Sequence, residues 1–386
     1  MTSTCRICEG TALNTILERA RAPVFQHVIY RNENESKTAK TGSIRLVCCA
    51  DCGFVFNADF DPSLVNYGPN YENDQSHSQF FLQHMELMAD RVLATLPAEG
   101  GGVVEVGCGQ GGFLVRLHRR IKTDKISLWG FDPSYRGGEL PEGVKIWRSL
   151  LSEKIMKGSN LNCDAVVTRH VIEHVADPLG FLATIRKSVS NGVRLLVETP
   201  SFDWISANRV LQDVFYEHVN YFAADTLSLA LARAGFGRCQ VTPVFGGQYL
   251  WADASPGIGN ADLPTSSRCA LAAAREYGAD VANQIAKWRL VLDGTSKTAV
   301  WGAGAKGITF VDLVDPDHTR IEMLVDINPN KQGAFAPSGH PIVSPVRAIE
   351  RQAKRIVVMN PNYEPEVRAV LDAQHWHATL IGGALL

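Results

Sequence analysis

One stretch decides the fold of this chain: Val103-Val104-Glu105-Val106-Gly107-Cys108-Gly109-Gln110-Gly111-Gly112-Phe113-Leu114. A short apolar, β-branched run carries an acidic residue, glycines follow at alternate positions, and an apolar stretch comes next. This pattern predicts a buried parallel strand, a tight turn and the start of a helix. The glycines let backbone N–H groups approach a ligand, because no Cβ stands in the way. A dinucleotide fingerprint would read Gly-x-Gly-x-x-Gly, but here the third glycine, Gly111, comes one residue early.

The pattern Glu105-x-Gly107-x-Gly109-x-Gly111 resembles motif I of class I S-adenosylmethionine (SAM) methyltransferases. The resemblance implies that these four residues contribute to a SAM site. Residues 127–132 read as a second strand, and its last residue, Asp132, lies 21 residues beyond Gly111. Such folds place there a carboxylate that accepts hydrogen bonds from ribose hydroxyls. The alternative is a glycine-rich turn that binds no cofactor.

Length and composition indicate a globular protein of two to three domains. The 386 residues are 45% hydrophobic and 20% charged, which suits a soluble chain. A formal charge of -2 gives no indication of nucleic acid or a membrane surface as a partner. No apolar run approaches the length of about 20 residues that a membrane span needs, and the start of the chain lacks the apolar core of a signal peptide. We therefore expect a cytoplasmic protein, in which the nine cysteines serve metal binding or burial rather than disulfides.

Four cysteines form the second motif. Cys5-x-x-Cys8 and Cys49-x-x-Cys52 each present two thiolates on one tight turn, and together they predict a closed tetrahedral site for structural Zn²⁺. Cys48 directly precedes Cys49 and is a competing ligand, but the two-residue spacing to Cys52 favours Cys49. The alternative is a group of reduced cysteines without metal.

After the first glycine turn, strands and helices continue to alternate. Five parallel strands followed by a hairpin would form the class I methyltransferase sheet, in which ligands bind beyond the carboxyl ends of the strands. We expect the further strands at residues 144–147, 164–168 and 193–198, the hairpin at 239–245 and 248–254, helices at 78–96, 225–234 and 268–292, and a solvated loop at 32–41.

The sequence of the last part of the chain predicts a second glycine turn. Residues 298–301 read as a strand, Gly302-Ala303-Gly304-Ala305-Lys306-Gly307 follows, and a later strand ends at Asp326. This does match the dinucleotide fingerprint, so a working NAD(H) domain, in an oxidoreductase or a sensor, is one alternative. However, only about 90 residues are left, which is short for the double mononucleotide-binding fold. We favour a truncated Rossmann-like lobe whose glycine turn receives a substrate phosphate.

These parts divide the chain into four units. The expected fold class is α/β, with a class I methyltransferase Rossmann-like sheet flanked by a zinc-binding module and a Rossmann-like lobe. We expect the zinc-binding module at 1–60, the SAM-dependent methyltransferase domain at 61–255, a connecting helical segment at 256–296 and the C-terminal lobe at 297–386.

The combination of a cysteine-knuckle module, a class I SAM domain, a Tyr216-Glu217-His218 segment and a terminal Gly-Ala-Gly-Ala-Lys-Gly lobe resembles the sugar 3-C-methyltransferases of deoxysugar biosynthesis. The resemblance covers essentially the whole chain, including residues 326–333. It implies methylation at C3 of a nucleotide-linked 4-keto sugar: a base removes the C3 proton, an enolate forms, and the carbon attacks the methyl group of SAM.

The family's catalytic stretch reads Tyr-His-Glu-His, and the matching residues here are Phe215-Tyr216-Glu217-His218. Glu217 and His218 match, and His218 stands where the family's proposed base stands. The family's tyrosine is replaced by Phe215, although Tyr216 places a phenol one residue later. A further active-site histidine and tyrosine of the family match His174 and Tyr71. The departure at Phe215 leaves the substrate and the methylated atom open.

The residues also allow other interpretations. A histidine is suited to moving a proton at neutral pH, but adjacent residues on a strand point to opposite faces, so Glu217 need not touch His218. His174 could simply cap the helix that follows it, and Tyr71 could only pack on the adenosine or on the core. O- or N-methylation of a sugar or another small molecule is the alternative reaction. The sequence indicates neither the sugar and its nucleotide nor the oligomeric state.

Overall fold

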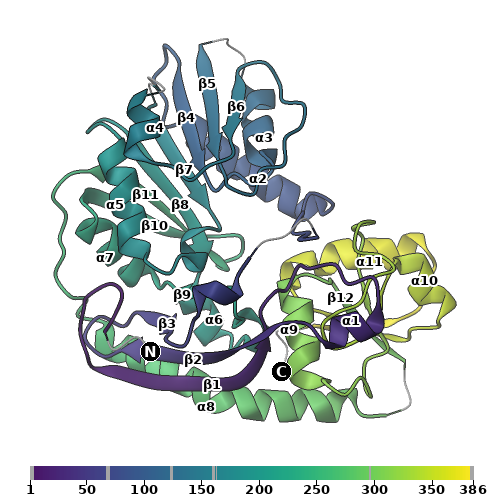
Figure 1. The fold of residues 1–386 in the computed structure, drawn as a ribbon. Coiled ribbons are helices and arrows are strands. Elements are labelled where there is room, and N and C mark those ends of the chain that lie inside the picture. Colours follow the sequence, from purple (N-terminus) through teal and green to yellow (C-terminus); the bar gives the residue numbers. More distant parts are fainter. Residues whose placement is uncertain are drawn as a thin grey trace.

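The computed structural model describes residues 4–66, 70–121, 125–158, 161, 163–294 and 297–382, which form three sheets with helices around them (Figure 1). The central sheet has the order β10-β11-β8-β7-β4-β5-β6. Five strands are parallel, β11 is antiparallel to β8, and β10 is antiparallel to β11. This topology confirms the predicted class I methyltransferase sheet. Its strands are β4 (Gly101–Val106), β5 (Ile126–Phe131), β6 (Val144–Trp147), β7 (Ala165–Arg169), β8 (Arg194–Pro200), β10 (Phe236–Val244) and β11 (Tyr249–Pro256).

Helices cover this sheet because its central strands are apolar on both faces. Val103 and Val104, adjacent residues of β4, are both fully buried, so one side chain on each face of the sheet needs a cover. The helices of this part of the chain are α2 (Gln79–Leu93), α3 (Gly112–Arg120), α4 (Glu153–Gly158), α5 (Pro178–Ser188), α6 (Phe202–Ala207) and α7 (Ala224–Arg233), with short 3₁₀ turns η2 (Ile172–His174) and η3 (Leu211–Asp213).

An antiparallel sheet of order β1-β2-β3-β9 forms the N-terminal module. Its fourth strand, β9, comes from the segment that follows η3, so this sheet extends across the expected boundary at residue 60. Residues 32–41 are not only a solvated loop: they contain the short helix α1, which Asn32 caps by accepting hydrogen bonds from two backbone N–H groups. The elements are β1 (Leu13–Pro23), α1 (Glu33–Lys37), β2 (Thr41–Cys49), β3 (Val55–Asn57), η1 (Pro62–Leu64) and β9 (Asn220–Tyr221).

The C-terminal lobe is a parallel sheet of order β14-β13-β12-β15-β16. The central strand β12 leads directly into the glycine turn, at the point where the strand order reverses. Ligands of open α/β sheets bind at such a switch point. The lobe consists of β12 (Thr298–Trp301), α9 (Ala305–Val314), β13 (Met323–Val325), β14 (Ile342–Val343), α10 (Pro345–Glu350), β15 (Arg355–Val358), η4 (Pro361–Tyr363), α11 (Glu364–Ala373) and β16 (Thr379–Gly382).

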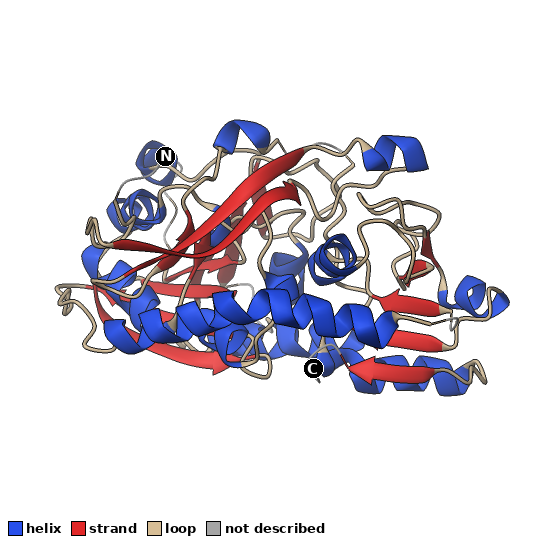
Figure 2. Cartoon of the chain, turned by 90° about the horizontal axis from the view of Figure 1, so that it is seen from below, coloured by secondary structure: helices blue, strands red, loops and turns tan. Residues whose placement is uncertain are grey.

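One long helix, α8 (Ser267–Leu292), underlies both the N-terminal module and the lobe (Figure 2). Tyr277 of α8 is buried in the cluster of the N-terminal module, and Trp288 is buried in the core of the lobe. Gly278 allows β1 to approach closely, because a Cβ at this position would lie 1.8 Å from the carbonyl oxygen of Ile16. None of the helices among the described residues is both long and apolar enough to cross a membrane.

Candidate active site

The glycine turn after β4 adopts the left-handed backbone that its sequence predicts. The φ angles of Gly107, Gly109 and Gly111 are 76°, 55° and 82°, in the region that favours glycine. A Cβ at Gly107 or Gly111 would contact Val171 or Ile146 at 2.3 and 2.4 Å, so these two glycines permit close packing. Gly109 is different, because a Cβ there would meet no described atom within 4 Å. The turn is therefore open at Gly109, where a ligand can approach the backbone.

Asp132 lies directly after β5 and holds this turn. One carboxylate oxygen accepts a hydrogen bond from the backbone N–H of Gly109 at 2.7 Å. The other oxygen accepts from the backbone N–H and the hydroxyl of Ser134, at 2.7 and 2.6 Å. A carboxylate offers about four lone-pair sites, so one is left for a ribose hydroxyl. The geometry thus fits the expected cofactor contact and adds a positioning role that the sequence did not indicate.

Glu105, within β4, is buried in an uncharged form. Its side chain is 3% exposed, and Oε2 has no hydrogen-bond partner among the described residues. Burial raises the pKa of Glu105 to about 8, nearby Arg169 opposes this shift, and Asp132 adds to it. A cationic ligand beside Glu105 would favour the ionised form.

A second buried carboxylate, Glu198 in β8, is charged. Arg169 donates to its Oε2 at 2.6 Å, and His84 of α2 forms a short contact with its Oε1. Arg169 and the hydrogen bond with His84 hold the pKa of Glu198 well below its usual range despite complete burial. Arg169 also lies over the ring of Phe113, 4.4 Å from its centroid, at the start of α3. The network fixes α2 and α3 against the carboxyl ends of β7 and β8.

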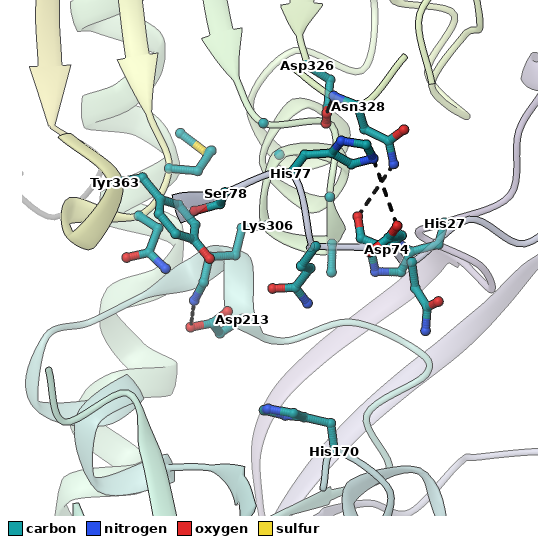
Figure 3. Close-up of a pocket in the computed structure, with 18 of the residues that line it drawn as sticks. His27, Asp74, His77, Ser78, His170, Asp213, Lys306, Asp326, Asn328 and Tyr363 are labelled. Atoms are coloured by element: carbon teal, nitrogen blue, oxygen red, sulfur yellow. Dashed lines mark hydrogen bonds and ion pairs between the residues drawn. The ribbon is translucent and has the colours of Figure 1, made fainter. Parts of the chain in front are cut away.

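A cavity of about 300 Å³ lies between these strand ends and the glycine turn of the C-terminal lobe. Four of the five predicted catalytic residues line it: Tyr71, His174, Glu217 and His218. Figure 3 shows the view into this cavity, with His170 on one side and Lys306, Asp326 and Asn328 of the lobe on the other.

Glu217 forms hydrogen bonds with Tyr71, Gln26 and His174. None of these hydrogen bonds involves His218. The hydroxyl of Tyr71 donates to Glu217 Oε1 at 2.7 Å, and the backbone N–H of Gln26 donates to Oε2 at 2.9 Å. The backbone carbonyl of Glu217 accepts a hydrogen bond from His174 Nδ1 at 2.8 Å. The carboxylate therefore orients the phenol of Tyr71, and the main chain orients the ring of His174.

His218 lies in surroundings that disfavour its protonated form. Its ring centroid is 3.9 Å from that of Phe215 and 4.9 Å from that of His174. Burial lowers the pKa of His218 well below its usual value, and nearby His174, His170 and Lys306 lower it further. At neutral pH the ring is uncharged and can accept a proton.

Tyr216 is placed outside the cavity. Its side chain is fully buried, its hydroxyl accepts a hydrogen bond from the backbone N–H of Asp61 at 2.9 Å, and its ring packs against Phe60. Phe215, the residue that precedes it, lines the cavity instead. The phenol of Tyr216 therefore does not replace the family's tyrosine at this wall.

Two protein families match the chain. The family described as "Methyltransferase domain" matches residues 77–239, which include the five parallel strands of the central sheet and the predicted SAM residues. The family described as "C-methyltransferase C-terminal domain" matches residues 276–382, which include the lobe.

Residues 77–239 are therefore a methyltransferase domain.

Curated relatives match parts of the chain. A ubiquinone biosynthesis O-methyltransferase of Cereibacter sphaeroides is 26% identical over 140 residues, which are 34% of this chain and 55% of that protein. A carboxy-S-adenosyl-L-methionine synthase of Wolinella succinogenes is 40% identical over 55 residues, 14% of this chain and 23% of that protein. The chain thus spans about half the length of the first relative.

Solved structures are similar over somewhat less than half of the chain. The CurJ carbon methyltransferase is 13% identical, with a TM-score of 0.36, over 47% of this chain and 56% of that chain. Human N-acetylserotonin methyltransferase in complex with SAM is 16% identical, with a TM-score of 0.36, over 46% of this chain and 55% of that chain.

The four cysteines of the two knuckles come together beside the methyltransferase domain. The four sulfur atoms all lie within 4.8 Å of one another. Cys5 and Cys52 are 3.6 Å apart, Cys8 and Cys49 are 3.5 Å apart, and none of them is in a disulfide. Four converging thiols on two turns fit a tetrahedral Zn²⁺ ion and leave no position for a substrate. Cys48 lies outside this cluster, with its sulfur 3.7 Å from the carbonyl oxygen of Gly53.

Several residues of the cavity were not among the predicted site residues. Glu173 and His170 come from the segment that follows β7, and their position at a strand end was the available signal. Asp213, from η3, pairs with Lys306 of the lobe. Lys331 and His27 also line the cavity, but they come from loops of the lobe and of the N-terminal module. Nothing in their local sequence places them beside the methyltransferase domain.

Proposed function

We propose that this protein is a SAM-dependent C-methyltransferase that acts on a nucleotide-linked keto sugar. The single observation that carries the proposal is the cavity itself. One wall holds neutral His218 with His174 and Tyr71, and the opposite wall is the glycine turn of the lobe. A ligand with a reactive sugar at one end and a diphosphate at the other would contact both walls. The match of the lobe to a C-methyltransferase C-terminal domain supports carbon as the methylated atom.

The wall formed by the lobe is suited to phosphate. Gly302, with φ of 100°, ends β12, and Gly304 caps the N-terminus of α9. Helix N-termini present unpaired N–H groups and a partial positive charge to anions. Lys306 and Lys331 line the same wall, and the ammonium group of Lys331 lies 3.1 Å from the carbonyl oxygen of Ala303 in the turn. These groups would bind the diphosphate of the substrate.

The other wall supplies the proton transfer. Bound SAM supplies the electrophilic methyl carbon. His218 accepts the proton from the carbon next to the ketone, and the electron pair of that C–H bond passes into the enolate. The hydroxyl of Tyr71, which donates to Glu217 in the structure, would turn its single hydrogen to the enolate oxygen once that charge forms. The enolate carbon would then take the methyl group, while the sulfur keeps the electron pair of the broken S–CH₃ bond and S-adenosylhomocysteine is left.

Deuterium exchange tests the methylated atom. In D₂O, with S-adenosylhomocysteine present, the wild-type protein should exchange the proton next to the ketone of a bound nucleotide 4-keto sugar. His218→Asn should keep its SAM affinity but lose both exchange and methylation, by roughly 10²–10⁴-fold in turnover, the usual contribution of a general base. Mass spectrometry of the sugar and calorimetry with SAM give the two measurements.

The control is His77→Asn, which removes another imidazole that lines the cavity. This variant should retain exchange. If a true substrate is methylated while the ring C–H deuterium is fully retained, carbon methylation is wrong. An oxygen or nitrogen acceptor, deprotonated by His218, would then take its place.

A further inference from the structure

The cavity contains a second group of metal-ligating side chains, separate from the four cysteines. Glu173, His174 and His218 each offer one ligand atom, and these atoms lie within 4.8 Å of one another. Glu173 and His174 belong to η2, and His218 lies just before β9. Two imidazoles and one carboxylate are a donor set that divalent transition metals bind, with the remaining coordination positions open.

Glu173 has one carboxylate oxygen that makes no hydrogen bond to the described residues. Its side chain is 1% exposed, and Oε2 accepts a hydrogen bond from the hydroxyl of Thr199 at 3.0 Å. Oε1 has no hydrogen-bond partner among the described residues, and neither has Nδ1 of His218. Buried polar atoms of this kind normally have a partner. A cation between them would satisfy both.

His174 is oriented as metal-bound histidines usually are. Its Nδ1 is 2.8 Å from the backbone carbonyl of Glu217, which can only accept, so Nδ1 carries the hydrogen. The lone pair of the neutral ring is therefore on Nε2. A ring held in this way by a carbonyl has a fixed tautomer and orientation, which strengthens metal binding.

The backbone holds the two segments together. The N–H of Val219 donates to the carbonyl oxygen of Glu173 at 2.7 Å, and the side chain of Asn220 donates to the carbonyl oxygens of Ile172 and Val175 at 2.9 and 2.7 Å. Two ligands on one tetrahedral Zn²⁺ ion are about 3.3 Å apart, given Zn–N distances of about 2.0–2.1 Å. Since no pair is more than 4.8 Å apart, none would have to approach by more than about 1.5 Å.

We propose that Glu173, His174 and His218 bind one divalent transition-metal ion from the cavity, and that this ion inhibits the enzyme. A neutral imidazole has one lone pair, so His218 cannot bind the ion and accept a proton at the same time. Only the inhibitory consequence rests on the proposed function, because binding itself requires no catalytic role. The competing arrangement is a protonated His170, whose Nδ1 lies 3.4 Å from Glu173 Oε1, as the charge partner of Glu173. That arrangement needs no metal.

Cobalt binding distinguishes the two arrangements. Protein purified with its cysteine site filled by zinc is titrated with Co²⁺ and followed by visible absorption. We expect one equivalent to bind with d–d bands but without the thiolate-to-cobalt charge-transfer band that a cysteine site gives. Glu173→Gln should weaken this binding about tenfold or more, and His174→Gln, a second variant in case the first misfolds, should do the same. His77→Asn should bind Co²⁺ as the wild type does.

Three outcomes would overturn the proposal: no binding to the wild type, equal affinity in the wild type and both ligand variants, or a spectrum with the thiolate band. Inhibition is tested separately. Zn²⁺ at a concentration that saturates the site should abolish deuterium exchange by the wild type, and exchange that continues would show that the ion is not inhibitory. If the wild type shows no exchange even without Zn²⁺, the proposed function fails, while the cobalt titration still decides the metal site.

Discussion

At the scale of single residues, the protonation of Glu105 is coupled to its ligand. In the free protein, burial raises the pKa of Glu105 to about 8, above its usual value of 4.5. At pH 7 the carboxyl group is therefore mostly protonated. SAM carries a positively charged sulfonium, and a cation beside the carboxylate would lower this pKa. Binding of SAM should then release a proton.

Calorimetry measures this release. At pH 7 the wild type should release up to about 0.9 proton per SAM, since a group with a pKa of about 8 is about nine-tenths protonated there. The number follows from the binding enthalpies in two buffers of different ionisation enthalpy. Glu105→Gln removes the titrating group without removing its volume, so any release that remains in this variant has another source. Equal release by both proteins would contradict the assignment.

The same raised pKa affects stability without SAM. A group whose pKa is higher in the folded state stabilises the protein below its unfolded pKa, and this contribution is lost as the pH rises through the folded value. Between about pH 4.5 and 8, Glu105 therefore makes the free protein less stable with rising pH. Glu105→Gln should remove this slope, which urea unfolding at several pH values would detect.

The role of a residue could be predicted where the backbone requires one residue type. The direction in which a side chain points could not be predicted. The alternate glycines of motif I follow from the backbone that a tight turn requires. The sequence made Tyr216 a candidate for the catalytic tyrosine of the family. In the structure, however, its side chain points to the backbone of Asp61. Glu173 was not among the predicted site residues, and its burial and the oxygen that makes no hydrogen bond became apparent only in the structure.

At the scale of elements, the two cysteine knuckles make a sharp prediction for metal content. We expect one Zn²⁺ per chain in the cluster of Cys5, Cys8, Cys49 and Cys52, and its loss should destabilise the fold by on the order of several kcal/mol. Cys49→Ser should lose zinc and lower the unfolding temperature. Cys48→Ser is the matched control, because the sulfur of Cys48 lies next to the cluster in sequence but outside it in the structure. Metal analysis of both variants checks this, and zinc lost only from Cys48→Ser would contradict it.

Most helices and strands could be predicted, because their hydrophobic periodicity is local information. The exceptions include the long strands β1 and β2 of the N-terminal module, with 11 and 9 residues, and two short elements. β9 has two residues and exists because β3 pairs with it. The helix α1 has five residues, too few for a periodic pattern, and rests on its cap at Asn32. Neither has a signal in its own stretch of sequence.

At the scale of the whole molecule, a nearly buried ion pair joins the N-terminal module to the lobe. Arg19 of β1 is 9% exposed and donates to Asp312 of α9 at 2.8 Å and to the carbonyl oxygen of Val214 at 2.9 Å. Arg19→Met would leave Asp312 without its partner and destabilise the protein by about 2 kcal/mol. This is below the range for fully buried pairs, because Asp312 is 24% exposed.

Urea unfolding measures the loss. The double variant Arg19→Met/Asp312→Leu should recover part of it, since no charge is then left unpaired. Arg347→Met is the control, because its pair with Glu350 is exposed and should contribute little. Equal effects of Arg19→Met and Arg347→Met would show that the pair does not hold the lobe in place.

The cavity could not be predicted from any single stretch, since it belongs to no single domain. Tyr71, His174 and His218 are far apart in the sequence, and the glycine turn of the lobe follows about 80 residues after the last of them. The glycine turn itself matched a dinucleotide fingerprint. In the structure Asp326 accepts a hydrogen bond from the N–H of Ala303 at 2.8 Å, as Asp132 does from Gly109. The two acids therefore have the same local role, and sequence spacing alone could not reveal it.

The helix α8 sets how far apart the two ends of a substrate can be. It is packed against the N-terminal module at Tyr277 and against the lobe at Trp288. One residue inserted between them would rotate the lobe by about 100° and shift it by 1.5 Å along the axis. The glycine turn would then face away from the histidines. If the substrate contacts both walls of the cavity as proposed, the length of α8 would then determine how long that substrate has to be.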